Sequence, residues 1–177
     1  TYRLSIPNRE VREVYKSFVR NWHEALQFRE TDELLRALVG EDYEEFERLL
    51  GKLVRGLFSC HDAARFPEAA YHAFVLGLLA NLRAIYEVRS NAESGYGRAD
   101  IILRPRTEQY PVGYVIEFKS IAGDEEIEPE MEKAFEQISR REYVTRLQEA
   151  GVEEANIRRI AVVVAGKQVA VRSRPGV

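Results

Sequence analysis

The sequence predicts an α/β fold, in which a helical arm precedes one core with the element order α-β-β-β-α-β-β. Apolar residues recur every three to four positions over the first third of the chain, as they do in amphipathic helices. Short β-branched runs bounded by turn residues follow. A long charged stretch of helical character then separates the third of these runs from the last two. With 177 residues, 45% of them hydrophobic, the chain is long enough to bury a sizeable core.

The helical arm is expected to run from Asn8 to about Leu57 as three helices, and Thr31 is a plausible N-cap of one of them. The next helix is expected from Pro67 to about Ala84, because proline suits the first position of a helix. We therefore divide the chain into residues 1–60, an arm or linker from an upstream domain, and residues 61–177, the core.

The strands of the core are expected where apolar, β-branched runs are bounded by turns. These runs are Ile85–Ser90, Ala99–Leu103, Val112–Phe118, Ile157–Ala165 and Gln168–Val171. Gly166 and Lys167 form a tight turn between the last two. One helix is expected from Glu125 to about Ala150, ended by Gly151.

Composition excludes several classes of protein. No apolar run approaches the roughly 20 residues of a membrane helix, so no membrane partner is expected. The single cysteine, Cys60, rules out an internal disulfide framework and a cysteine-rich zinc site, and a reducing, cytoplasmic setting is the simplest interpretation. The chain begins with Thr1, which suggests a piece of a longer protein. The net charge of −3 counts mildly against a free-standing DNA-binding protein, but less against a nuclease with an acidic metal cluster.

Three charged residues lie inside otherwise apolar strands: Asp100, Glu117 and Lys119. A four-residue hairpin loop, 107–110, would pair residue 106 with 111 and, six pairs further along, Asp100 with Glu117. Directly paired residues point to the same face, with Cβ atoms about 4.5–5.5 Å apart. Lys119 projects from that face too, since alternate residues of a strand share a side. One small patch is thus expected to hold two carboxylates and an ammonium.

Such a patch suits hydrolysis of a phosphodiester with the help of a hard divalent cation. Two like charges at this distance repel, so a bridging cation would stabilise them. Carboxylate and carbonyl oxygens favour Mg²⁺, with Mn²⁺ able to substitute, over zinc. The cation would activate a water molecule, and Lys119 would orient that water or neutralise developing charge. The competing interpretation is a surface salt bridge between Lys119 and either acid.

The pattern of Asp100, sixteen intervening residues, then Glu117-Phe118-Lys119 resembles the PD-(D/E)XK nuclease superfamily. It is most similar to the nuclease domain found C-terminal to bacterial AAA-ATPase-like domains. The residues that carry this resemblance are 6–11 (IPNREV), 71–72 (YH), 94–100 (SGYGRAD), 115–119 (VIEFK), 134–138 (AFEQI) and 166–167 (GK).

The resemblance implies a restriction-endonuclease-like αβββαβ core, with a central mixed sheet flanked by helices. It implies that Asp100, Glu117 and the Phe118 carbonyl bind the metal ion and that Lys119 serves the water. Glu68 is similar to an extra acidic ligand on the preceding helix, and Gln137 to a polar residue that faces the site. It also implies nucleic acid, foremost DNA, as substrate, and an upstream ATPase domain in the full-length protein.

Several of these residues have simpler interpretations. An acid in the first turn of a helix, such as Glu68, is favoured by the helix dipole whatever the protein does. His72, one turn on, would contact phosphate or be a packed, hydrogen-bonded residue. Gln137 would face the site or solvent. Arg98 would contact phosphate or pair with a neighbouring acid.

Three functions remain open on the sequence alone. The first is a Mg²⁺-dependent nuclease. The second is a catalytically silent, nuclease-like module that binds nucleic acid or regulates an ATPase. The third is a helical protein-interaction domain whose working surface is the arm of residues 8–57.

Overall fold

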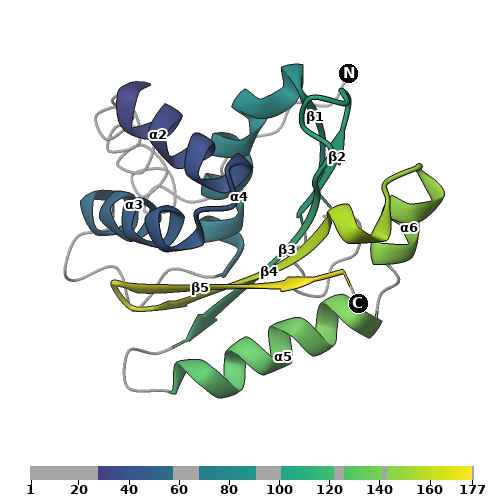
Figure 1. Cartoon of the computed structure of the whole chain (residues 1–177). Coiled ribbons are helices and arrows are strands. Elements are labelled where there is room, and N and C mark those ends of the chain that lie inside the picture. The colour runs from purple at the N-terminus through teal and green to yellow at the C-terminus, as the bar shows by residue number, and fades with distance from the viewer. Residues whose placement is uncertain (1–27, 58–67, 91–100, 122–125, 141–142, 177) are drawn as a thin grey trace, which may run out of the picture.

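The five strands that the structure describes form one mixed sheet between two layers of helices (Figure 1). The computed structural model describes residues 28–57, 68–90, 101–121, 126–140 and 143–176. The strand order is β1-β2-β3-β4-β5, and the only parallel pair of this sheet is β3 and β4. The elements, in chain order, are α2 (Phe28–Val39), α3 (Tyr43–Leu57), α4 (Glu68–Leu79), the 3-10 helix η1 (Ala80–Ala84), β1 (Tyr86–Ser90), β2 (Ile101–Pro105), β3 (Gly113–Ile121), α5 (Ile127–Arg140), α6 (Tyr143–Glu149), the 3-10 helix η2 (Glu154–Asn156), β4 (Ile157–Ala165) and β5 (Gln168–Pro175).

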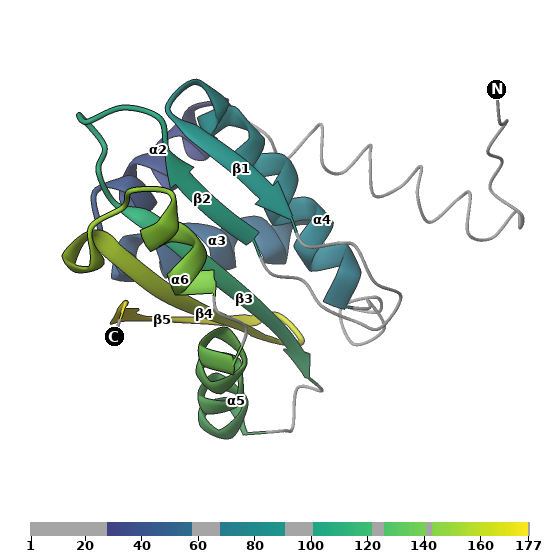
Figure 2. The ribbon, with the colours of Figure 1, turned by 90° about the vertical axis from the view of Figure 1, so that its right-hand side faces the viewer.

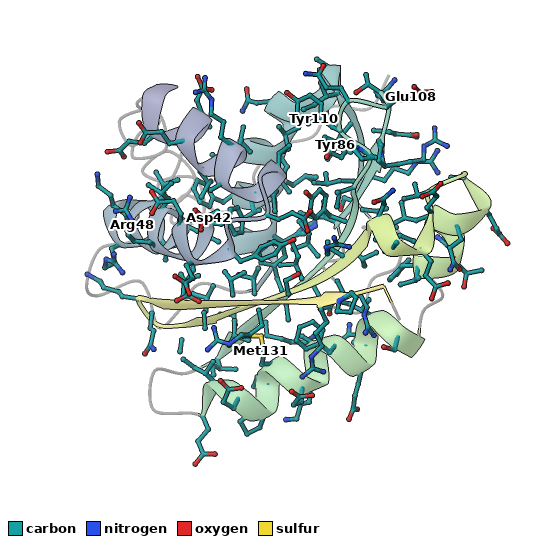
Figure 3. All side chains as sticks on the ribbon, viewed as in Figure 1. Asp42, Arg48, Tyr86, Glu108, Tyr110 and Met131 are labelled. Atoms are coloured by element: carbon teal, nitrogen blue, oxygen red, sulfur yellow. The ribbon has the colours of Figure 1, made fainter. Side chains whose placement is uncertain are left out.

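Each face of the sheet has its own hydrophobic core. Helices α2, α3 and α4 cover one face, where Tyr114, Ile116 and Phe118 of β3 point. Helix α5 and, beside it, α6 cover the other face, which includes Val115 of β3. Met131 points from α5 into this second core (Figure 3 labels it; Figure 2 shows α5 and α6 on this side). Because β3 and β4 are covered on both faces, most of their residues are apolar and buried.

Long-range contacts hold α2 and α3 against the sheet. The Tyr114 hydroxyl donates a hydrogen bond to the Leu38 carbonyl at 3.2 Å. Glu41, in the turn between the helices, has a φ of 59°, and its Oε2 accepts a hydrogen bond from Arg158 Nε of β4 at 2.5 Å. The Val171 backbone N–H of β5 donates to Glu47 Oε2 at 2.7 Å. Both helices therefore belong to the same packed body as the sheet.

Most of the elements expected from the sequence are present, and the α/β class with a mixed, helix-flanked sheet is confirmed. The expected division at residue 60 stays a prediction, although α2 and α3 share a core with the sheet instead of extending away from it. The part of the expected arm that precedes residue 28 lies outside the described residues. No helix of the described segments is long and apolar enough to cross a membrane.

Three expectations were wrong. Thr31 was expected to cap the start of a helix, but it is the fourth residue of α2. The stretch 125–150 was expected to be one helix, but it contains two, α5 and α6. The loop between β2 and β3 was expected to span four residues, but the strands end at Pro105 and begin again at Gly113. The Arg106 N–H donates to the Ile85 carbonyl at 2.9 Å, so this residue continues the pairing with β1 instead of turning back along β3.

Candidate active site

Glu117 and Lys119 lie on the face of β3 that α5 covers. Strand residues alternate between faces, and Val115, two residues before Glu117, belongs to the core beneath α5. The Glu117 side chain is 0% exposed and that of Lys119 is 15% exposed. A carboxylate and an ammonium are therefore withdrawn from bulk water at one point of the sheet.

Lys119 connects strand β3 with helix α5 through its ammonium group. Its Nζ donates to Glu117 Oε1 at 2.9 Å and to Gln137 Oε1 at 2.6 Å. An ammonium group can only donate, so it is the oxygen of the Gln137 amide that must face it. Gln137 thus contacts Lys119 from α5, and its role at the site stays a prediction. The three side chains form a continuous chain from carboxylate to ammonium to amide.

One oxygen of Glu117 is not satisfied by any part of the chain that the structure describes. Its Oε2 is buried and has no hydrogen-bond partner among the residues that the structure describes. A buried, ionised carboxylate oxygen without a partner costs several kcal/mol. A hard cation is the kind of ligand that such an oxygen accepts, so this atom fits the divalent metal ion expected from the sequence.

The other expected metal ligands contribute less to the described geometry. Asp100 lies outside the described residues, as do Arg98 and the side chain of Glu68, which opens α4. Phe118 is described, but its ring points to the opposite face, so only its backbone carbonyl would be available. Within the described segments no group of three or more His, Cys, Asp or Glu side chains is placed to hold a metal ion.

The register of the β2–β3 ladder is the one expected from the sequence. Ile101 pairs with Ile116, Ile102 with Val115 and Leu103 with Tyr114. The expected register therefore holds in all three described pairs, although the loop that joins the strands is longer than expected.

His72 lies across the sheet from Glu117 and Lys119. It is 9% exposed on α4, and its Nε2 is 3.1 Å from the Ser90 hydroxyl at the end of β1. Its ring meets the Phe118 ring edge-on, with centroids 6.3 Å apart. The contact of His72 with phosphate stays a prediction. Ser90 was not expected beside His72, since the two are 18 positions apart in the sequence and no sequence signal connects them.

Comparison with known proteins identifies the family of the core. A family model described as the PD-(D/E)XK nuclease superfamily matches residues 66–174, more than half of the chain. The match contains both strands of the hairpin and helix α5. No curated protein and no solved structure gives a significant match.

Proposed function

Because this chain belongs to the PD-(D/E)XK nuclease superfamily, we propose that it is a metal-dependent nuclease that hydrolyses phosphodiester bonds of DNA, or of RNA. The observation that carries this proposal is the buried Oε2 of Glu117, which has no hydrogen-bond partner among the described residues and lies beside the ammonium group of Lys119. The superfamily supports the reaction class, and this pair of side chains supports the position of the site.

Asp100 is proposed as the second carboxylate of the site. The described ladder ends with Ile101 opposite Ile116, and one further pair would place Asp100 opposite Glu117. Two residues further along the ladder, Ile102 pairs with Val115, and both side chains belong to the core beneath α5. By alternation, the pair 100 and 117 faces α5 as well, which would bring two carboxylates together.

We propose that Asp100, Glu117, the Phe118 carbonyl and Glu68 hold Mg²⁺, or Mn²⁺ in its place. When bound, such an ion stabilises charge on the scissile phosphate and lowers the pKa of an attacking water. Lys119, whose ammonium group donates to Glu117 and Gln137, would orient that water or neutralise developing charge. Gln137 holds the ammonium in place from α5.

The wider setting is also a proposal. The resemblance of residues 6–11 to the segment that follows a bacterial AAA-ATPase-like domain supports an upstream ATPase in the full-length protein, with residues 1–60 as the connection and residues 61–177 as the nuclease core. A cytoplasmic location agrees with the single cysteine.

The test combines metal binding with cleavage. Titration calorimetry with Mn²⁺ and cleavage of labelled DNA and RNA are measured for the wild type, Asp100→Ala and Glu117→Gln. We expect Mn²⁺ binding and cleavage in the wild type and the loss of both in the two variants. Glu108→Gln is the matched control, since Glu108 is exposed in the loop at the other end of the hairpin (Figure 3). A wild-type protein that binds no divalent ion and cleaves neither substrate would refute the proposal.

A further inference from the structure

The strand pair β1–β2 is the open part of the face that carries the candidate site. Helix α5 makes its main sheet contacts with β3 and β4, and α6 with β3. Figure 2 looks onto β1 and β2 from this side, with α6 next to them and α5 below. On this face Ile102 is buried, but the charged side chains of β1 and β2 are in contact with solvent.

Arginines dominate this open face. Arg104 lies on the same side of β2 as Ile102, which faces the core beneath α5. In the ladder with β1, Arg104 pairs with Glu87 and Ile102 pairs with Arg89. Glu87 and Arg89 therefore point to this side as well. The side chains of Arg89 and Arg104 are 67% and 43% exposed. Arg106, also exposed, extends the row.

The only acidic side chain that these strands place among the arginines is Glu87. Its Oε1 accepts from Arg89 Nε at 2.6 Å, and its Oε2 pairs with Arg104. The hydrogen bond from Arg89 and the charges of Arg104 and Arg106 lower the pKa of Glu87, so its carboxylate is ionised at neutral pH. Three arginines and one glutamate still leave a net charge of +2, on a chain whose net charge is −3.

The arginines begin close to the candidate site. Arg89, Ile102 and Val115 occupy one cross-strand row, and Glu117 is the next residue of β3 on the same face. The Cα atoms of Arg89 and Glu117 are two strand spacings of about 4.8 Å apart across the sheet. Along the strands they are two residues apart, with a rise of about 3.4 Å per residue. A polyanion that crosses the open face would pass from these arginines to Glu117 and Lys119.

We propose that Arg89, Arg104 and Arg106 bind the phosphodiester backbone of the nucleic acid and guide it to the site. This inference rests on the proposed function and names the surface that holds its substrate. The planar guanidinium group matches phosphate with two parallel hydrogen bonds. Such contacts orient the nucleic acid without reading its sequence, and Glu87 keeps two of the guanidinium groups in position while it lowers the charge of the face.

Binding measured without divalent ions tests the proposal separately from cleavage. Fluorescence anisotropy with labelled duplex and single-stranded oligonucleotides, in EDTA and over a range of salt, compares the wild type with the double variant Arg89→Gln/Arg104→Gln. We expect weaker binding of every sequence and a salt slope reduced by about 1 for each arginine removed. Arg48→Gln/Arg55→Gln is the matched control, because it makes the same charge change on α3, across the sheet. The control is expected to retain the wild-type slope.

Glu87→Gln is a second variant, whose expected effect cannot result from misfolding. It removes the one negative charge among the arginines, so we expect tighter binding than in the wild type. Unchanged affinity in both Glu87→Gln and the double arginine variant would overturn the proposal. Displacement of DNA by polyglutamate of equal charge and concentration would also overturn it, and would identify an acidic protein as the partner.

Cleavage kinetics distinguish the failure of this inference from the failure of the proposed function. If the wild type cleaves, the arginine variant should raise KM and leave kcat unchanged, which supports both proposals. Cleavage with wild-type KM in that variant would refute the arginine surface alone. Binding that depends on the arginines, without metal-dependent cleavage by the wild type, would refute the nuclease and keep the surface. A wild-type protein that binds no nucleic acid would refute the surface.

Discussion

Ile101 lies directly opposite Ile116 in the antiparallel ladder of β2 and β3, and this pair is the one nearest to the candidate site. Ile101 and Ile116 both point into the core beneath α2, α3 and α4. The next pair along the ladder would be Asp100 and Glu117, and both side chains would then point to the opposite face of the sheet, toward α5. A shift of the ladder by one residue would separate the two carboxylates.

A disulfide between positions 100 and 117 tests this register. In a Cys60→Ser background, Asp100→Cys/Glu117→Cys should oxidise to a cross-link, since paired Cα atoms in an antiparallel ladder lie about 4.5–5.5 Å apart, within disulfide range. Asp100→Cys/Lys119→Cys is the control, because diagonal positions are about 7–8 Å apart. Peptide mapping by mass spectrometry without reductant measures both yields. Equal yields in the two variants would contradict the register.

The sequence predicts those features that depend on periodicity and on neighbours in a hairpin. Alternation within β3 is sufficient to place Glu117 and Lys119 on one face, and turn residues delimit the strands. The register was also predicted, although the assumed loop was too short. It holds because the observed loop is centred on almost the same residues as the assumed one, so the pairs further along the two strands are unchanged.

Features that depend on tertiary contacts could not be predicted in this way. Gln137 reaches Lys119 only because α5 packs across β3, and Glu41 meets Arg158 across 117 residues of sequence. The separation of α5 from α6 also lacks a local signal, since no proline or glycine lies between residues 130 and 150. Each of these contacts is determined by the packing of distant segments, not by local propensity.

Lys119→Met should reduce both stability and catalysis. In EDTA, the free energy of unfolding should fall by about 3–5 kcal/mol, because a buried carboxylate loses its partner. Mg²⁺ or Mn²⁺ should recover part of this loss by binding to the folded state. The kcat for cleavage should fall by about 100-fold or more, as when a charge-stabilising donor is removed from an active site.

The matched control for this variant is Lys133→Met on α5, whose ammonium pairs with Glu130 in an exposed position. Such a surface pair contributes about 0–1 kcal/mol, and its loss should not respond to metal ions. Urea denaturation with and without Mg²⁺ measures the difference between the two lysines. Equal losses in both variants would show that the buried pair has no special role.

Gln137→Leu should slow catalysis without weakening substrate binding. The variant keeps the size of the side chain but removes the acceptor for Lys119, and hydrogen bonds to charged groups contribute about 1.5–3 kcal/mol. We expect kcat to fall by about tenfold or more, with KM unchanged, because Gln137 acts through Lys119. Gln137→Glu retains an acceptor and should recover part of the rate, and Gln148→Leu, exposed on α6, is the control. A change in KM alone would indicate a substrate contact instead of a positioning residue.

Glu41→Ala should destabilise the attachment of α2 and α3 to the sheet. It removes the partly buried pair with Arg158 and keeps a side chain in a left-handed backbone conformation, with a φ of 59°. The expected loss is about 1–3 kcal/mol. Glu41→Gly loses the same pair but relieves the backbone, so it should be about 1 kcal/mol more stable than Glu41→Ala. Chemical denaturation checks this order, and Glu45→Ala, which breaks an exposed pair with Arg48, should have little effect.

Alkaline pH should destabilise the protein through two buried tyrosines, one on β1 and one on β3, the strands on either side of β2. The rings of Tyr86 and Tyr114 lie 5.9 Å apart, and burial raises the pKa of Tyr86 to about 12. Burial, and then the neighbouring Tyr86, raise the pKa of Tyr114 as well. In the unfolded chain both phenols ionise near pH 10, so the unfolded state releases protons first as the pH rises.

The stabilisation that comes from the neutral phenols is therefore fully present below pH 10 and is lost as the pH rises from 10 toward 12. Tyr86→Phe removes one of the two groups, so its free energy of unfolding should decline less steeply over this range than that of the wild type. Tyr143→Phe, on α6 and in the other core, is the control and should follow the wild type. Urea denaturation at pH 8, 10 and 11 measures the three slopes, and parallel slopes in wild type and Tyr86→Phe would contradict the assignment to this pair.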